Sequence, residues 1–307
     1  MRKNIWIQLL CAIILTIVLL SSMVACKISI EADIPPMPYP SQPLPQPPED
    51  NSNPEDNEVI PPNTNSSTTV PPIQESTSNS SSSNAGNTTQ TPAVQNDVYV
   101  RSITNGLNVR SAPTTSSSVL GTLNTNDMVL FIEKQGSWYK TVYKNTTGYV
   151  SASSQYTNLY SLPRSSNATI EKIISLGYTR LGYKYVYGAI RLHNGKGVFL
   201  KDFKDNEYDC SSLMQYIFYY GGNILLDVTT RTQVVQGQHI DKSKVRRGDL
   251  LFFTNANRKN NVGVEKIGHV GIYLGNNYML HTSSDYAVIE PMSKTRQSYL
   301  IEGRRFL

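Results

Sequence analysis

The residues best suited to covalent chemistry in this chain are one cysteine and two histidines. The 307 residues include Cys11, Cys26 and Cys210; Cys11 lies within an N-terminal apolar run, and Cys26 lies six residues after its end. The rest of the chain therefore holds a single thiol, with no partner there for an intramolecular disulfide. Such a thiol is either a small buried hydrophobe or a nucleophile, and a nucleophile needs a base. His269 and His281 are the candidates for that base.

The residues around Cys210 predict that it begins a helix over 210–220. Asp209 is a preferred N-cap residue. Apolar residues recur at helical spacing and are expected on one face: Leu213, Met214, Ile217 and Tyr220. Gly221 and Gly222 are expected to end the helix. The first turn of a helix offers unsatisfied N–H groups and the positive end of the dipole, which stabilise a thiolate.

The two histidines are expected to share one face of a sheet. Strands are predicted over 249–253, 269–274 and 278–283. Because side chains alternate across a sheet, an odd-numbered loop keeps His269 and His281 on the same side. A three-residue loop over 275–277 pairs position 271 with 281 and sets the histidines diagonally, about 7–8 Å apart. One imidazole could then serve the thiol while the other orients the first.

A second chemistry is open to the same three residues. Cysteine and histidine are also ligands of zinc. The only carboxylate beside them, that of Asp209, caps the helix, and a thiol at a helix start is activated without a metal. We therefore expect thiol chemistry with no metal and no cofactor. His193 and His239 lie in polar, loop-like stretches and are expected to be solvated.

The elements that must position these residues indicate an α+β fold. Apolar residues over 169–182 follow a helical stripe that Gly182 closes. This helix and the one that begins with Cys210 precede the strands that carry the histidines. A helix with cysteine at its start, packed on an antiparallel sheet that carries histidine, is the arrangement of papain-like enzymes. We expect such a domain over residues 165–307.

The same region resembles the NlpC-type cell-wall cysteine peptidases. The motifs that carry the resemblance are Tyr-Asp-Cys-Ser-Ser (208–212), Gly-Asp-Leu-Leu-Phe-Phe (248–253), His-Val-Gly-Ile-Tyr (269–273) and Leu-His-Thr (280–282). The resemblance implies that Cys210 is the nucleophile, His269 the general base and His281 the polar residue that orients the base. The motif over 184–189 implies that Tyr185 lies near the nucleophile and helps to bind the oxyanion.

The resemblance also implies a substrate, the peptidoglycan stem peptide, cut between γ-D-glutamate and the following diamino acid. Asp209 and Ser211 are implied on the substrate side. One carboxylate oxygen of Asp209 would cap the helix, and the other would accept the free amine of an N-terminal L-Ala. The alternative is that Asp209 only caps the helix. The alternatives are a catalytically idle wall-binding module, or an amidase or acyltransferase that acts on another amide.

The sequence departs from the family pattern around these motifs. Lys184 replaces a proline, Ala189 replaces a glycine, and Ser212 replaces the glycine after Asp-Cys-Ser. The stretch 189–208 is longer than is usual in the family. The catalytic set is unaffected, and the differences fall on the substrate side.

A small all-β unit is predicted ahead of this domain, over residues 97–160. Its β-rich runs, spaced by about ten residues and separated by turns, are 107–110, 119–123, 128–133, 138–143 and 148–151. The motifs Leu-Asn-Val-Arg-Ser-Ala-Pro (107–113) and Gly-Tyr-Val-Ser (148–151) resemble the bacterial SH3-like domain. That domain binds cell-wall peptides or shapes a neighbouring active site.

The N-terminus predicts export. Residues 1–4 carry positive charge, residues 5–20 are apolar, and Ala25 precedes Cys26. An apolar core of about 16 residues suits a secretory signal better than a membrane span of about 20. The junction resembles a bacterial lipobox, which implies a lipoprotein signal peptide over 1–25 and lipidation of Cys26. An uncleaved membrane anchor is the alternative, and both place the rest of the chain on the extracellular face of the membrane.

Residues 26–96 are expected to form a disordered tether. Residues 31–96 hold 14 of the 17 prolines, eight acidic residues and no Lys or Arg, so they cannot bury enough apolar surface to order themselves.

Residues 97–307 carry 25 basic and 15 acidic residues, a balance that suits an acidic polymer or an anionic surface. No basic run is interleaved with aromatics, so we expect no nucleic-acid partner. We expect a monomer that binds stem peptides and, through its lipid, the membrane.

Overall fold

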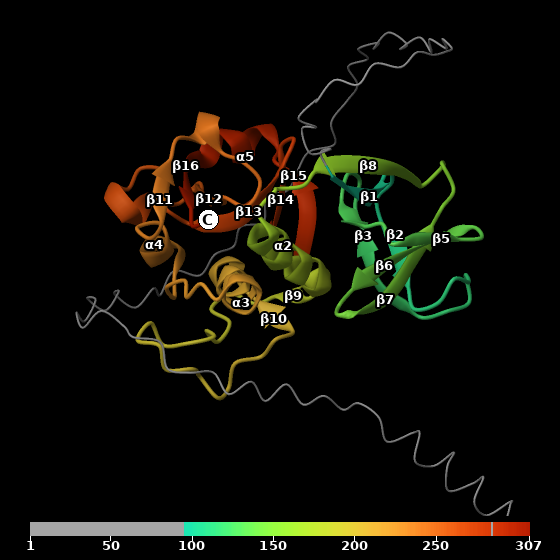
Figure 1. The fold of residues 1–307 in the computed structure, drawn as a ribbon, viewed down its shortest axis with the longest axis horizontal. Helices are drawn as coiled ribbons and strands as arrows, with labels where there is room; N and C mark the ends of the chain where they lie inside the picture. Colours follow the sequence, from blue (N-terminus) through green and yellow to red (C-terminus); the bar gives the residue numbers. More distant parts are fainter. Residues whose placement is uncertain (1–94, 284) are drawn as a thin grey trace, which may run out of the picture. The chain divides into compact units, whose positions relative to one another are not determined.

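A nine-stranded sheet, a five-stranded sheet and two helices make up most of the part of the chain that the structure describes. The computed structural model describes residues 95–283 and 285–307 (Figure 1). The predicted signal peptide over 1–25, the lipidation site Cys26 and the tether up to residue 94 lie outside these residues. Within the described ranges, no helix is long and apolar enough to cross a membrane.

The five-stranded sheet contains most of the β-rich runs predicted for the small domain. In order across the sheet, its strands are β3 (Val119–Leu123), β2 (Leu107–Arg110), β7 (Thr146–Ser151), β6 (Trp138–Tyr143) and β5 (Glu133–Gln135). The prediction of one strand over 128–133 is wrong, because the chain changes sheets there. The N–H of Phe131 donates to Val98 in one sheet, and the N–H of Ile132 donates to Lys140 in the other.

The nine-stranded sheet is antiparallel and includes strands from both predicted domains. Its order is β11 (Gln238–Ile240), β16 (Leu300–Arg305), β12 (Leu250–Phe253), β13 (His269–Gly275), β14 (Tyr278–Thr282), β15 (Ala287–Pro291), β4 (Met128–Leu130), β1 (Asn96–Ser102) and β8 (Thr157–Pro163). Strands β12 to β14 confirm the strands predicted around the histidines. The pair Ile289 and Met128 joins the two halves. The α+β class with an all-β N-terminal unit is confirmed.

Two helices cover one face of the central strands (Figure 1). Helix α2 (Ala168–Arg180) is capped by Asn167, whose side chain accepts from the N–H groups of Thr169 and Ile170. It ends before Gly182, which has φ of +83° and leaves no room for a side chain: a Cβ there would lie 2.1 Å from the Tyr143 ring. The remaining short elements are β9 (Lys184–Tyr185), β10 (Glu207–Tyr208), α4 (Thr230–Gln233), α5 (Lys294–Tyr299) and the 3-10 turns η1 (Lys242–Lys244) and η2 (Gly263–Lys266).

Helix α3 (Cys210–Gly222) begins where the sequence predicted and ends later. Gly221 and Gly222 belong to the helix, so the prediction that they end it is wrong. A Cβ on either glycine would lie 2.6 Å from an atom of Ile173 in α2, so the glycines permit close helix packing. Asn223, in the left-handed conformation, is the C-cap. Tyr220 was expected on the apolar face but is 47% exposed.

A buried ionic cluster fixes α2 and β1 to the start of β12. Arg247 donates from Nε to Glu171 (2.7 Å) and from Nη2 to Asp97 (2.6 Å). Tyr178 of α2 also donates to Asp97 (2.8 Å), and its ring meets that of Tyr99 edge to face. Because every charge in the cluster is paired, the loss of one partner would leave an uncompensated buried charge.

The hairpin that carries the histidines has a different turn from the predicted one. The loop contains two residues, Asn276 and Asn277, both with positive φ (46° and 67°), as the tightest hairpin turns require. A bulge between Tyr273 and Gly275 adds the extra residue. The three-residue loop is therefore wrong, but the bulge restores the same parity, and the histidines face the same side.

Candidate active site

Cys210 lies in the first turn of α3, buried against the start of β13. It is 9% exposed, and its sulfur is hydrogen-bonded by the backbone of Val270 and of Ser211. Burial raises the pKa of the thiol to about 12, and the neighbouring charge of Asp209 adds to the increase. The sequence predicted a thiolate stabilised by the helix start. In the resting site, burial outweighs that effect, and the side chain is a neutral thiol.

The two histidines of the hairpin are in direct contact. Nε2 of His269 lies 3.0 Å from Nδ1 of His281, and the ring planes are almost perpendicular, at 85°. Burial lowers the pKa of both imidazoles, and the positive charge of Arg296 lowers them further. Both rings are therefore neutral at physiological pH. The prediction that these side chains lie together on one face is confirmed.

The thiol and the histidine pair meet at the start of β13. The backbone contact with Val270 places the Cys210 sulfur beside the residue that follows His269. Within the described part of the chain, no hydrogen bond joins this sulfur to the His269 ring. Catalytic hydrogen bonds are often long before substrate binds and tighten in the substrate complex. Nδ1 is the nitrogen of His269 that is not used by His281, and it is the one available to the thiol.

Two charged residues that the sequence analysis missed extend the histidine pair. Glu290 of β15 lies with Oε1 2.9 Å from Nε2 of His281, and Arg296 of α5 lies 3.6 Å from the same oxygen. Burial opposes ionisation of Glu290, but the contacts with His281 and Arg296 outweigh it and lower the pKa of the carboxyl. The strand register could have revealed Glu290. It pairs His281 with Val288, and Glu290, two residues after Val288, faces the same side of the sheet.

Asp209 uses both carboxylate oxygens within the protein. Oδ1 accepts from the N–H of Ser212 (2.8 Å) and from the hydroxyl of Ser211 (3.0 Å), so the predicted cap is confirmed. Oδ2 accepts from the guanidinium of Arg191. This is the oxygen that the sequence analysis expected to receive a substrate amine, and such an amine would have to displace Arg191. Ser211 is 3% exposed, with its hydroxyl turned to Asp209.

Strand pairing places Tyr185 beside the segment that leads into Cys210. Strand β9 pairs in parallel with β10, and Tyr185 lies opposite Tyr208, two residues before Cys210. The N–H of Tyr185 also donates to the carbonyl of Asp285 (2.9 Å). These bonds place its backbone at the edge of the site. Its assigned role at the oxyanion remains a prediction.

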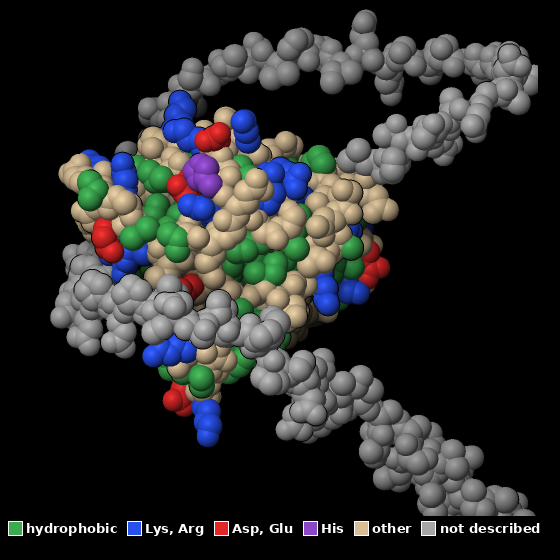
Figure 2. Space-filling model, turned by 60° about the vertical axis from the view of Figure 1, so that its left-hand side comes forward, with side chains coloured by type: hydrophobic (Ala, Val, Ile, Leu, Met, Phe, Trp, Pro, Cys, Tyr) green, Lys and Arg blue, Asp and Glu red, His purple; other side chains and the backbone are tan. Residues whose placement is uncertain are grey.

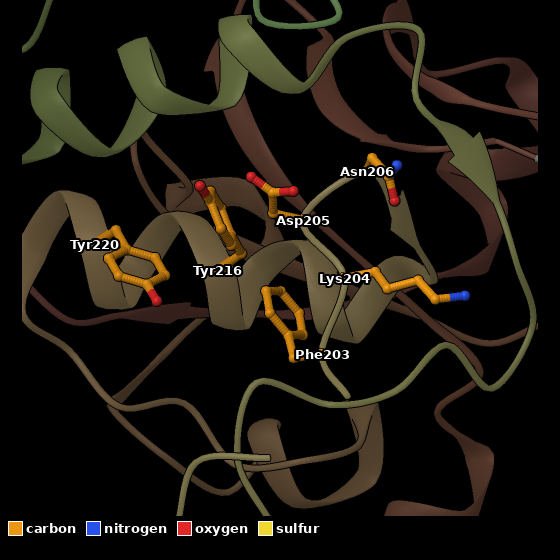
Figure 3. A pocket seen from close by; sticks show the side chains of 6 residues that line it. All are labelled: Phe203, Lys204, Asp205, Asn206, Tyr216 and Tyr220. Carbon is orange, nitrogen blue, oxygen red and sulfur yellow. The ribbon is translucent and has the colours of Figure 1, made fainter. Parts of the chain in front are cut away.

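The long stretch over 189–208 packs beside α3 and lines one side of a pocket. A pocket of about 500 Å³ lies between this stretch and α3, and its lining side chains are labelled in Figure 3. The pocket is lined by Phe203, Lys204, Asp205, Asn206, Tyr216 and Tyr220. The Phe203 and Tyr216 rings are stacked, with centroids 5.9 Å apart. None of the lining residues belongs to the cysteine and histidine set, so this pocket is separate from the thiol.

His193 was expected to be solvated, and that prediction is wrong. The side chain is buried, Nδ1 accepts from the N–H of Gly195 (3.0 Å), and Nε2 contacts the carbonyl of Leu226 (2.7 Å) and the amide of Gln215. Burial lowers its pKa. The polar composition of the stretch concealed this, because the partners come from the middle of α3 and from the segment after the helix. His239, by contrast, is half exposed.

Two observations concern the binding of metal ions and of nucleic acid. Among the described residues, no group of three or more His, Cys, Asp and Glu side chains is arranged to hold a metal ion. On the face in Figure 2, Lys and Arg side chains are scattered among acidic and polar ones and form no single basic patch. Counterion-driven binding of nucleic acid depends on many basic side chains that lie together along the backbone.

Comparisons with known proteins match the two halves of the described chain separately. The model of the NlpC/P60 family matches residues 182–305, and the model of the bacterial SH3 domain matches residues 105–157. A probable endopeptidase NlpC homolog of Haemophilus influenzae is 41% identical over 80 residues, which are 26% of this chain and 38% of that protein.

Two relatives from Bacillus extend over more of the chain. The peptidoglycan DL-endopeptidase CwlO of Bacillus licheniformis is 34% identical, over 43% of this chain and 27% of its own length. The gamma-D-glutamyl-L-lysine dipeptidyl-peptidase of Bacillus subtilis is 33% identical, over 43% of this chain and 38% of its own length. The chain thus spans well under half the length of these relatives. The region that matches the NlpC/P60 family model, residues 182–305, includes Cys210, His269 and His281, and it follows the region that matches the bacterial SH3 domain.

Proposed function

We propose that this protein is a peptidoglycan hydrolase, a cysteine endopeptidase that cleaves the amide bond between γ-D-glutamate and the following diamino acid of stem peptides. The observation that carries the proposal is the placement of a thiol at a helix start beside a hydrogen-bonded histidine pair. Two of the relatives named above are a peptidoglycan endopeptidase and a γ-D-glutamyl peptidase, which supports the choice of substrate.

The proposed reaction uses Cys210 and His269 as a unit. The thiol proton passes to Nδ1 of His269 as the sulfur attacks the amide carbonyl. The carbon–nitrogen bond breaks, the leaving amine takes the proton from Nδ1, and a thioester remains on Cys210. His269 then deprotonates water, which attacks the thioester and releases a carboxylic acid and the free thiol.

The neutral state of the resting Cys210 thiol determines when the thiolate–imidazolium pair forms. Because burial holds the pKa of Cys210 at about 12 and lowers that of His269, the ion pair forms only as the reaction proceeds. The developing oxyanion is assigned to the backbone N–H of Cys210 at the start of α3, with Tyr185 as a second donor. His281 keeps the base in position and transfers no proton itself.

The proposed setting is the outer side of a bacterial membrane. A lipoprotein signal over 1–25, lipid on Cys26 and the tether over 26–96 would hold the two folded domains within reach of the wall as a monomer. The support is the sequence itself: a short basic region, an apolar core and a small residue before Cys26. The bacterial SH3 domain is proposed to contact wall peptides or to limit the substrate groove.

Digestion of purified peptidoglycan, with mass spectrometry of the products, tests the function. The expected result is a set of new γ-D-glutamate termini, present with wild-type protein and absent with Cys210→Ala. Binding to the wall without cleavage would indicate an idle binding module, and products cut at another amide would indicate an amidase. Activity that chelators remove and zinc restores would support the metal alternative.

A further inference from the structure

The hydrogen-bonded chain of the site continues beyond the two histidines to the protein surface. Nδ1 of His281 faces Nε2 of His269, and Nε2 of His281 faces Oε1 of Glu290. His281 is fully buried, whereas the Glu290 side chain is 28% exposed. Strand pairing sets this arrangement, because His281 lies opposite Val288, and Glu290, two residues later, points to the same face.

We propose that Glu290 is a positioning residue that selects the tautomers of both histidines, so that His269 keeps a lone pair for the thiol. The inference deepens the proposed function, and its catalytic consequence rests on that function. The tautomer assignment itself rests on the contacts among the three side chains and on an ionised Glu290 beside Arg296.

The contacts between these side chains determine which ring nitrogens carry protons. An ionised carboxylate only accepts hydrogen bonds, so Nε2 of His281 carries a proton and donates it to Glu290. A neutral imidazole has one proton, so Nδ1 of His281 is an acceptor. Nε2 of His269 must then be the donor across the 3.0 Å contact. Nδ1 of His269 is left unprotonated, which is the form that a base needs to take the proton of Cys210.

Arg296 keeps Glu290 ionised, and therefore able to accept the hydrogen bond from Nε2 of His281. Its guanidinium lies 3.6 Å from Oε1 of Glu290 and contacts the ring face of Phe253, which in turn lies beside His269. A cation at this place favours an ionised Glu290 and disfavours a second proton on either imidazole. Without the carboxylate, His281 loses its side-chain acceptor at Nε2 and keeps only the backbone of Thr282 as a further partner, so its proton is no longer held on Nε2 and can move to Nδ1. His269 would then be forced into the wrong tautomer.

Nitrogen-15 NMR of histidine-labelled, full-length protein tests the assignment directly in the wild type. The expected result is a proton on Nε2 and none on Nδ1 in both His269 and His281. A wild-type His281 with its proton on Nδ1 would overturn the proposal. This measurement needs no variant to fold.

The variant Glu290→Met removes the acceptor and keeps the length of the side chain. We expect His281 to become a mixture of tautomers and kcat to fall roughly ten- to a hundredfold, the range for loss of a hydrogen bond to a charged group. KM should change much less, because the proposed role of Glu290 acts through His281 and not through the substrate. Glu290→Asp keeps the carboxylate and should recover part of kcat.

The matched control is Glu302→Gln. Glu302 is also a strand glutamate paired with an arginine and beside a histidine, and it is 19% exposed, but it has no contact with His269 or His281. It should leave both tautomers and kcat unchanged. Unchanged tautomers in Glu290→Met would overturn the proposal, even if kcat falls.

The two hypotheses can fail separately. A protein that cleaves no wall, but whose His281 tautomer shifts in Glu290→Met, keeps the positioning role and loses the proposed function. A protein that cleaves wall at γ-D-glutamate with the same rate and tautomers in Glu290→Met keeps the function and loses the positioning role.

Discussion

The guanidinium of Arg191 is bound to the carboxylate of Asp209, the residue directly before Cys210. The pair joins the long stretch over 189–208 to the start of α3. Arg191 also donates to the carbonyl of Ala189 (2.9 Å), which holds its side chain in place. The oxygen that a substrate ammonium would use is therefore already bonded to a cation of the protein.

We predict that Arg191 weakens any preference for substrates with a free amine. In Arg191→Met, Oδ2 of Asp209 loses its partner and becomes available to an ammonium. The ratio of kcat/KM for L-Ala-γ-D-Glu-diaminopimelate to that of its N-acetylated form should rise, by roughly ten- to a hundredfold for one charge-assisted bond. The ratio is the proper measure, because the unpaired Asp209 charge also raises the pKa of the thiol and slows both substrates.

The control for this prediction is Lys204→Met. Lys204 lies on the same stretch and pairs with Glu207 on the surface. It should leave the ratio as it is in the wild type. An equal ratio in Arg191→Met and wild type would show that Asp209 only caps the helix.

A second prediction ranks the catalytic residues. Cys210→Ala and His269→Ala should each abolish wall hydrolysis, and the double variant should be no worse than either, because the two side chains act as one unit. His281→Ala should retain more activity than His269→Ala and less than wild type, since an orienting residue fixes the ring without transferring the proton. His239→Ala is the control, because this histidine is half exposed and away from the pair. Wild-type rates in His281→Ala would remove its assigned role.

The sequence predicted the parts of the site that depend on local patterns. Asp209 marks a helix start through the preference of N-caps for short polar side chains, and this placed Cys210 correctly. Alternation along strands placed His269 and His281 on one face. The two histidines share a face although the predicted loop length is wrong. The face depends only on whether the number of residues between the paired positions is odd or even, and the bulge after Tyr273 supplies the residue that the shorter turn lacks.

The parts that were not predicted depend on tertiary contacts. In the sequence, the pair Gly221 and Gly222 predicts a helix end. A glycine pair also permits two helices to approach closely, and only the position of Ile173 distinguishes the two roles. Arg191 reaches Asp209 from an irregular stretch that carries no periodic signal. Glu290 could have been found only by extending the strand register beyond the histidine hairpin.

A third prediction concerns the pH dependence of the thiol. Because burial raises the pKa of Cys210 to about 12, the thiolate fraction should increase about tenfold per pH unit between pH 6 and 9. The rate of alkylation by iodoacetamide in the full-length protein should rise in the same way, without a plateau. The signal of Cys210→Ala, subtracted at each pH, removes the contribution of other thiols. A rate that is constant above pH 6 would indicate a preformed thiolate–imidazolium pair.

The last prediction concerns Asp127, which is 3% exposed between the two halves of the nine-stranded sheet. Burial raises its pKa to about 7; the N–H of Asn124 (2.7 Å) opposes the rise, and the charge of Glu290 adds to it. In the unfolded chain an aspartate loses its proton near pH 4. Between these values the folded state binds more protons, so the contribution of Asp127 to stability is complete below about pH 4 and is lost as the pH rises through about 7.

Asp127→Asn imitates the protonated form at every pH, and its amide oxygen can still accept from Asn124. The unfolding temperatures of variant and wild type should therefore be similar at about pH 4 and diverge as the pH rises to about 7. Below pH 7 the difference in unfolding free energy should grow by up to about 1.4 kcal/mol per pH unit, in favour of the variant. Asp241→Asn, at an exposed site, should show no such trend. Comparing each variant with wild type at the same pH cancels the opposite contribution of the buried histidines, whose lowered pKa values make the fold less stable in acid. The hydroxyl of Tyr286 also donates to Asp127 (3.5 Å) and opposes the rise in its pKa. A difference that is constant across this range would mean that Asp127 is ionised throughout and that the bonds from Asn124 and Tyr286 fully offset its burial.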